Sequence, residues 1–293
     1  MTTAILLMLL TGLTWGAVGV LFGAAPSDKD RLYAFFSFNG ILYNAFVWLT
    51  QTPSAAAPVG EIARLALIMM PSAAMEVVAF LLLKYAMNRG SQGIAWCIAQ
   101  SAMVITFLCA IIFLHNPSSA TQWTGMALAL ASLFLFARDK PTKEGGANDT
   151  VYFLCAFGSF ALIGFGSFLR QIPGYAGFSP ETLTWRLPLQ APVGMVFWTT
   201  LCIAKGIWKP GLVWKISLPY AAVVTLGQAC FFAATDAADA LRITSVVMPV
   251  ATGTCILLFA LWCRFFRHER FSKGGWIAVG LGIAGIALLS LKP

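Results

Sequence analysis

Charged side chains are scarce in this sequence. Asp, Glu, Lys and Arg make up 10% of the 293 residues, whereas they make up about 25% of an ordinary soluble domain. Hydrophobic residues make up 59%, and a water-soluble core could not bury that much apolar surface. The composition therefore excludes a soluble globular protein and indicates a membrane protein, in which each helical crossing needs about 20 apolar residues.

The sequence also lacks the patterns that are typical of enzymes and metal sites. It has two histidines, and its seven cysteines show no paired spacing of the zinc or disulfide kind. It contains no His-Glu-x-x-His or Gly-x-Ser-x-Gly motif. Gly12-x-x-x-Gly16 follows no predicted strand, so it indicates helix packing rather than phosphate binding. We expect no enzyme activity, no metal, no cofactor and no nucleic-acid partner.

Ten apolar runs, bounded by proline, glycine or charge, predict ten transmembrane helices. The first run lacks the positive start of a signal peptide and is long enough to span, so we count it as a helix. The polar segment 138–150 separates five runs from five, which predicts two halves, 1–137 and 151–293. The expected helices cover residues 3–22, 32–50, 61–86, 91–114, 119–137, 151–171, 180–204, 213–238, 242–266 and 273–291.

An internal repeat supports this division. At an offset of 153 residues, His115 corresponds to His268 and Trp123 to Trp276, and both pairs fall at equivalent helix connections. Because five helices per half is an odd number, the second half must enter the membrane with the opposite orientation. The sequence therefore predicts an all-α membrane protein of ten transmembrane helices, arranged as a 5+5 inverted repeat with a substrate site near the bilayer midplane.

The basic residues are distributed unevenly over the expected connections. Connections after odd-numbered helices carry fourteen of the 19 lysines and arginines, Lys84 and Arg89 among them. The positive-inside rule places such connections in the cytoplasm. We therefore expect both termini outside.

Two motifs carry a family resemblance that covers essentially the whole chain. A Trp-Gly pair lies in the first helix, in Gly12-Leu-Thr-Trp15-Gly16, and the last connection reads Arg267-His-Glu269-Arg-Phe-Ser-Lys-Gly-Gly-Trp276. With ten helices in two halves, the chain resembles the EamA-like permeases of the drug/metabolite transporter superfamily. The equivalent connection of the first half runs from Asn116 to Trp123 without the acid. The resemblance implies an inner-membrane secondary carrier with a cavity lined by helices 1, 3, 4, 6, 8 and 9, which moves metabolites such as amino acids, sugars, nucleotide derivatives or amines.

Five residues are expected to bind substrate. Glu76 lies near the middle of the third helix, where an ionisable group is interpreted as functional, and desolvation there would let it take up and release a coupling proton. Trp96 and Gln100 share one helix face, and Trp15 could stack on a ring or hold a cation. Gln228 lies in the body of the eighth helix. Each of these side chains could instead pack or tie helices together.

Other polar residues allow two interpretations. Asn39 and Tyr43, one turn apart on the second helix, are expected to serve packing rather than the cavity. Two interfacial ion pairs, Asp236 with Arg242 and Arg170 with Glu181, could close the cavity as gates together with Asp239, although the same residues could be solvated helix ends.

The predicted function is transport by alternating access of a small polar organic solute, neutral and sugar- or nucleoside-like, with proton coupling through Glu76. Organic cations or amino acids are the alternative. We expect a carboxylated or phosphorylated solute to be disfavoured, since Arg170 and Arg186 lie away from the centre of their helices. A channel or a membrane-embedded enzyme is the alternative of another class. The expected partners are the solute and the lipid bilayer, and the expected oligomeric state is monomer or homodimer.

Overall fold

The computed structural model describes residues 2–114, 118–138, 150–207, 213–239, 247–268, 272–289 and 291, and within these residues every regular element is a helix. The elements are α1 (Thr2–Gly23), α2 (Lys29–Thr50), α3 (Val59–Arg89), α4 (Gln92–Gln100), α5 (Met103–Leu114), α6 (Ala120–Arg138), α7 (Thr150–Tyr175), α8 (Pro180–Leu183), α9 (Arg186–Ala204), α10 (Trp214–Asp239), α11 (Val247–Phe266) and α12 (Lys273–Leu289).

Eight segments of the described chain are long and apolar enough to cross a membrane. Gln92–Leu114, which contains α4 and α5, counts as one of them, and Pro180–Ala204, which contains α8 and α9, as another. Helices α6, with 19 residues, and α12, with 17, are not among the eight. The all-helical prediction is confirmed for the described residues, and ten crossings stay a prediction.

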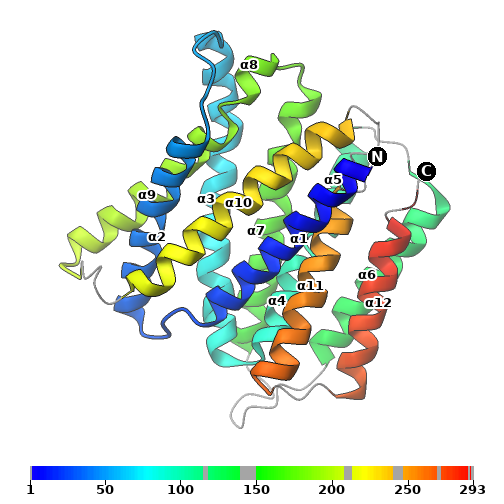
Figure 1. Ribbon diagram of the computed structural model, residues 1–293. Coiled ribbons are helices and arrows are strands. Elements are labelled where there is room, and N and C mark those ends of the chain that lie inside the picture. Colours follow the sequence, from blue (N-terminus) through cyan, green and yellow to red (C-terminus); the bar gives the residue numbers. More distant parts are fainter. Residues whose placement is uncertain are drawn as a thin grey trace.

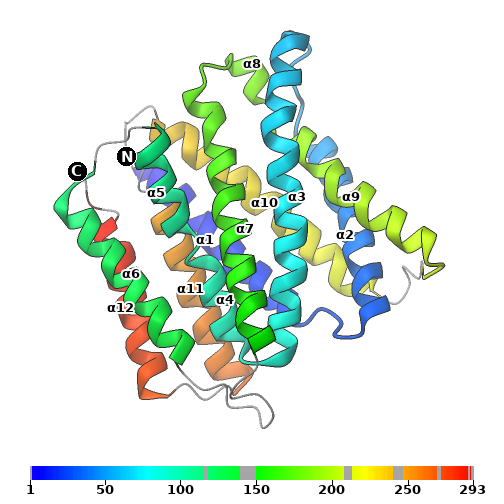
Figure 2. The same cartoon turned by 180° about the vertical axis from the view of Figure 1, so that it is seen from behind.

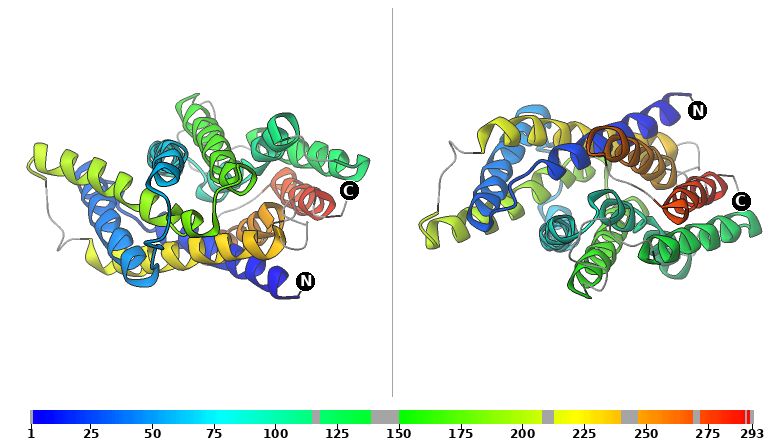
Figure 3. Two further views of the ribbon diagram at one scale, coloured as in Figure 1. Left: turned by 90° about the horizontal axis from the view of Figure 1, so that it is seen from above. Right: turned by 90° about the horizontal axis from the view of Figure 1, so that it is seen from below.

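The long helices run side by side between two ends of one bundle. Helices α6 and α12 pack together at one edge, and α2 and α9 pack together at the opposite edge (Figure 3). Between these edges, α3 packs on α7, and α1 packs on both α10 and α11. Both termini lie at one end of the bundle, whereas α3 ends and α12 begins at the other (Figures 1 and 2).

The packing of α1 on α11 confirms the interpretation of the Gly12-x-x-x-Gly16 motif. A Cβ atom on Gly16 would lie 2.6 Å from the Leu258 side chain, and one on Gly12 would lie 2.5 Å from Cβ of Thr254. Glycine at both positions therefore allows close contact between the two helices.

Two expected helices are interrupted. The helix expected over 91–114 breaks between α4 and α5, where the Ser101 hydroxyl donates to the Cys97 carbonyl at 2.8 Å and so competes with the helical hydrogen bonds. The helix expected over 180–204 is split into α8 and α9. Ser179 caps α8 by accepting from the amide of Thr182.

The expected end of the third helix was wrong. Helix α3 continues three residues further, to Arg89, and ends at Gly90, whose amide donates to the carbonyl of Ala86. Lys84, which falls within the expected range 61–86 but was counted above with the following connection, lies inside the helix and is fully buried. The segment 138–150 lies outside the described residues except for its two ends, so the boundary between the halves stays a prediction.

Candidate functional site

Polar side chains from several helices converge on one cavity of about 160 Å³. Nine of the described helices contribute to its wall, namely α1, α2, α3, α4, α5, α7, α9, α10 and α11. Its polar lining residues are Asn39, Tyr43, Glu76, Gln100, Ser167, Arg170, Gln190, Tyr220, Gln228 and Thr252.

The five residues expected to bind substrate all line this cavity. Trp15 comes from α1 and packs on Phe231, with ring centroids 5.4 Å apart. Trp96 is 1% exposed, and its indole N–H donates to the Cys255 sulfur at 3.4 Å. The indole N–H of Trp96 is therefore occupied by the protein, and Trp96 offers the cavity an aromatic surface only. The remaining three residues are Glu76 on α3, Gln100 on α4 and Gln228 on α10.

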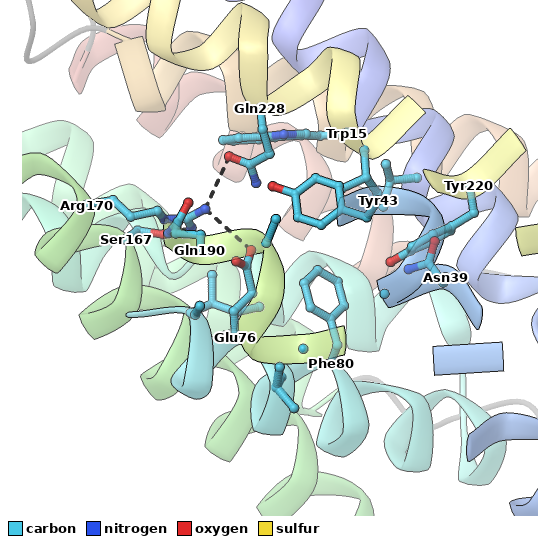
Figure 4. A pocket seen from close by; sticks show the side chains of 18 of the residues that line it. Trp15, Asn39, Tyr43, Glu76, Phe80, Ser167, Arg170, Gln190, Tyr220 and Gln228 are labelled. Atoms are coloured by element: carbon cyan, nitrogen blue, oxygen red, sulfur yellow. Dashed lines mark hydrogen bonds and ion pairs between the residues drawn. The ribbon is translucent and has the colours of Figure 1, made fainter. Parts of the chain in front are cut away.

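A buried arginine lies at one side of the site. Nη1 of Arg170 is 3.4 Å from Oε1 of Glu76 and 3.4 Å from Oε1 of Gln228, and Nη2 donates to the Ser167 hydroxyl at 2.9 Å (Figure 4). The side chain of Arg170 is 5% exposed and that of Glu76 is 29% exposed. The guanidinium is thus held in the protein wall while the carboxylate meets the open space.

Both contacts of Nη1 are longer than the 2.7–2.9 Å usual for charged hydrogen bonds. Within the described chain, Nε of Arg170 is buried without a hydrogen-bond partner. The guanidinium therefore has donor capacity that the protein leaves unused.

The predicted pairing of Arg170 with Glu181 was wrong. Helix α7 runs on to Tyr175, with Pro173 inside it, so Arg170 lies more than a turn before the helix end and faces Glu76 instead. Arg170 lies away from the centre of α7, as expected, but its side chain lines the cavity.

Asn39 and Tyr43 of α2 also line the cavity, so the expectation that they serve packing was wrong. Oδ1 of Asn39 is buried and, among the described residues, accepts no hydrogen bond. The two side chains are one turn apart and share a helix face. That spacing of two polar residues in an apolar helix was the signal that the sequence offered.

Gln190 is a lining residue that the sequence analysis did not select for the site. Its amide lies 3.4 Å from the Ser72 hydroxyl, and that hydroxyl donates to the carbonyl of Gly166 at 2.9 Å. This chain of contacts joins α9, α3 and α7 directly beside Arg170. The cavity wall is therefore fixed by polar contacts as well as by packing.

The expected gate residues are arranged differently from the prediction. Asp236 pairs with Arg186, whose Nη2 lies 2.9 Å from Oδ2 and 3.1 Å from Oδ1. The guanidinium of Arg186 also lies 4.4 Å from the Phe232 ring centre. Arg242 lies outside the described residues, and of Asp239, the last residue of α10, the side chain is not described.

No three His, Cys, Asp or Glu side chains gather into a possible metal site in the part of the chain that is described.

Comparisons with known proteins agree with this architecture. Residues 2–138 match the sequence model of the EamA-like transporter family. One solved structure, titled only "Crystal structure of protein", is 14% identical, and the alignment covers 98% of this chain and 96% of that chain with a TM-score of 0.56. That likeness concerns the fold alone. No curated protein matches the chain.

Proposed function

We propose that this protein carries a small polar organic solute across the inner membrane by alternating access. The proposal starts from the match of residues 2–138 to the EamA-like transporters, which indicates a multi-pass membrane protein of the drug/metabolite transporter type. The observation that carries the proposal is the cavity at which nine of the described helices meet around Glu76 and Arg170. Burying an ionisable pair in an apolar bundle is costly, and such a pair is therefore interpreted as functional.

The proposed architecture is ten crossings in two inverted halves, with α4 and α5 forming one crossing and α8 and α9 another. The packing pairs support it, because they are preserved when the halves are exchanged. The contact of α1 with α10 has its equivalent in that of α7 with α3, while α2 with α9 and α6 with α12 each pair equivalent helices. Such a repeat puts the substrate site where the halves meet, and the cavity takes residues from both halves.

The charges favour the amino-acid alternative over a neutral sugar. A guanidinium with unused donors would hold a carboxylate, and the carboxylate of Glu76, open to the cavity, would hold an ammonium. Arg170 and Glu76 lie at one side of the cavity, and Asn39 and Tyr220 lie at the other (Figure 4). The proposed solute is therefore a small zwitterion whose charged groups face the pair and whose side chain faces the aromatic wall.

Proton coupling through Glu76 is part of the proposal. Its carboxylate is accessible from the cavity, and the groups that face it from neighbouring helices are Arg170, Tyr43 and Tyr220. A protonated Glu76 would lose its attraction for both Arg170 and an ammonium group. Proton uptake would thus weaken the same contacts that hold the solute.

Counterflow in proteoliposomes tests the proposed substrate class. Vesicles loaded with unlabelled amino acids, sugars, nucleosides or amines are assayed for uptake of the labelled compound of the same class. We expect accumulation with amino acids, and weak or no accumulation with amines that lack the carboxylate. Counterflow of sugars or amines alone would refute the zwitterion and leave a carrier, and equilibration without overshoot for every compound would indicate a channel.

A further inference from the structure

Lys84 is a buried cation that the proposed site does not use. It lies on α3 and is fully buried. Its Nζ donates to the carbonyl of Phe22 at 3.1 Å and to that of Gly23 at 3.3 Å. Both carbonyls belong to the last turn of α1, where a cation is favoured by the helix dipole. A charge buried in this way holds the two helix ends together strongly.

Phe22 links this contact to the aromatic floor of the cavity, by which we mean the four lining aromatic residues that Phe22 contacts. Its ring is buried, and its centroid lies 5.4 to 6.5 Å from those of four aromatic residues. All four line the cavity, whereas Phe22 packs against them without lining it. They are Phe36, Phe80, Trp96 and Tyr220.

Helix α3 holds Phe22 at two points. Phe80 meets its ring edge-on at 5.4 Å, and Lys84, one turn further along α3, binds its carbonyl. Glu76 lies one turn before Phe80, so the three residues share one face of α3. The charged site, the aromatic floor and the lysine contact therefore follow each other along one helix, toward the end of the bundle opposite the termini (Figure 1).

We propose that Lys84 is the latch of a gate, which closes the cavity at the end opposite the termini by fixing the end of α1 under the aromatic floor. An alternating-access carrier must open at both ends in turn. Opening this end requires α3 and α1 to separate, which breaks both hydrogen bonds of Lys84 and moves Phe22 away from Phe80. The proposal rests on the carrier function proposed above.

The test measures access to the cavity and needs no substrate. A Val224→Cys reporter on the cavity wall is reacted with a membrane-impermeant maleimide from each face of oriented vesicles. Lys205→Cys, exposed at the C-cap of α9, identifies the face at the latch end. The same chain without a reporter gives the background of the native cysteines.

Lys84→Met removes the ammonium and keeps the length of the side chain. We expect the reporter to react at least about tenfold faster from the latch face, because the variant loses both hydrogen bonds and the loss of one charge-assisted hydrogen bond already corresponds to about tenfold. Nζ of Lys84 lies 5.7 Å from the centre of the Phe22 ring. Lys29→Met is the matched control, because Nζ of Lys29 likewise lies 5.8 Å from the centre of the Tyr33 ring, but Lys29 is exposed. It should leave the rate unchanged.

Phe80→Leu provides a second test if Lys84→Met does not fold. It removes the ring contact with Phe22 and keeps both hydrogen bonds of Lys84, and it should raise the rate from the same face. Unchanged labelling in a folded Lys84→Met or Phe80→Leu protein would overturn the latch and reduce Lys84 to a cap of α1. If maleimide labelling responds as expected but the native protein shows no counterflow of any solute, the proposed carrier function is overturned and the proposed gate is not.

Discussion

Replacing Arg170 by methionine tests the charged part of the site. The guanidinium contacts Glu76, Gln228 and Ser167, and its side chain is 5% exposed. Methionine keeps an unbranched apolar chain but removes every donor. A hydrogen bond to a charged group contributes about 1.5–3 kcal/mol, so a bound carboxylate should lose about 10- to 100-fold in affinity.

Thermal unfolding of purified protein measures this loss. An amino acid present at 100 times its Kd stabilises the native state by about 2.7 kcal/mol, and after a 100-fold loss of affinity the same concentration gives about 0.4 kcal/mol. Arg31→Met, at an exposed arginine near the start of α2, controls for loss of a positive charge. Ligand stabilisation that survives in Arg170→Met, or that falls equally for an amine without a carboxylate, would refute the assignment of Arg170.

Two further predictions concern packing and the second ion pair. Gly285→Ala should destabilise the protein by about 1–3 kcal/mol, because the new Cβ would lie 2.7 Å from the carbonyl oxygen of Gly125 in α6. Gly280→Ala is the control, since a Cβ at that position meets nothing within 4 Å. Equal melting temperatures for the two variants would contradict the α6–α12 contact. Asp236→Asn should lower the melting temperature more than Arg186→Met, since it leaves a guanidinium 9% exposed without its partner, while Asp236 is 58% exposed and stays in water. The reverse order would show that the pair is not held as described.

The sequence made the core of the cavity predictable for a physical reason. Polar side chains in transmembrane helices are few and costly, so Glu76, Gln100 and Gln228 could be selected one by one from apolar runs. Their convergence on one cavity could not be derived, because it depends on how α3, α4 and α10 pack. The role of these residues in binding stays a prediction.

The errors came from helix ends and from helix faces. Arg170 and Lys84 lie near the ends of apolar runs, and a shift of three or four residues at such an end decides whether a charge is solvated or buried. Asn39 was assigned to packing because the second helix was expected at the periphery. Hydropathy fixes the existence of a helix better than its last turn or the direction of its faces.

The most direct test of the central claim is amino-acid uptake driven by a pH gradient in proteoliposomes, compared for the native protein, Glu76→Gln and the exposed control Glu181→Gln. The account predicts that the native protein and the control accumulate the amino acid and that Glu76→Gln does not. Any amino-acid exchange that remains in Glu76→Gln should no longer depend on pH. Uptake that still follows the pH gradient in Glu76→Gln would contradict the claim that this carboxylate, facing Arg170 in the cavity, couples proton movement to transport.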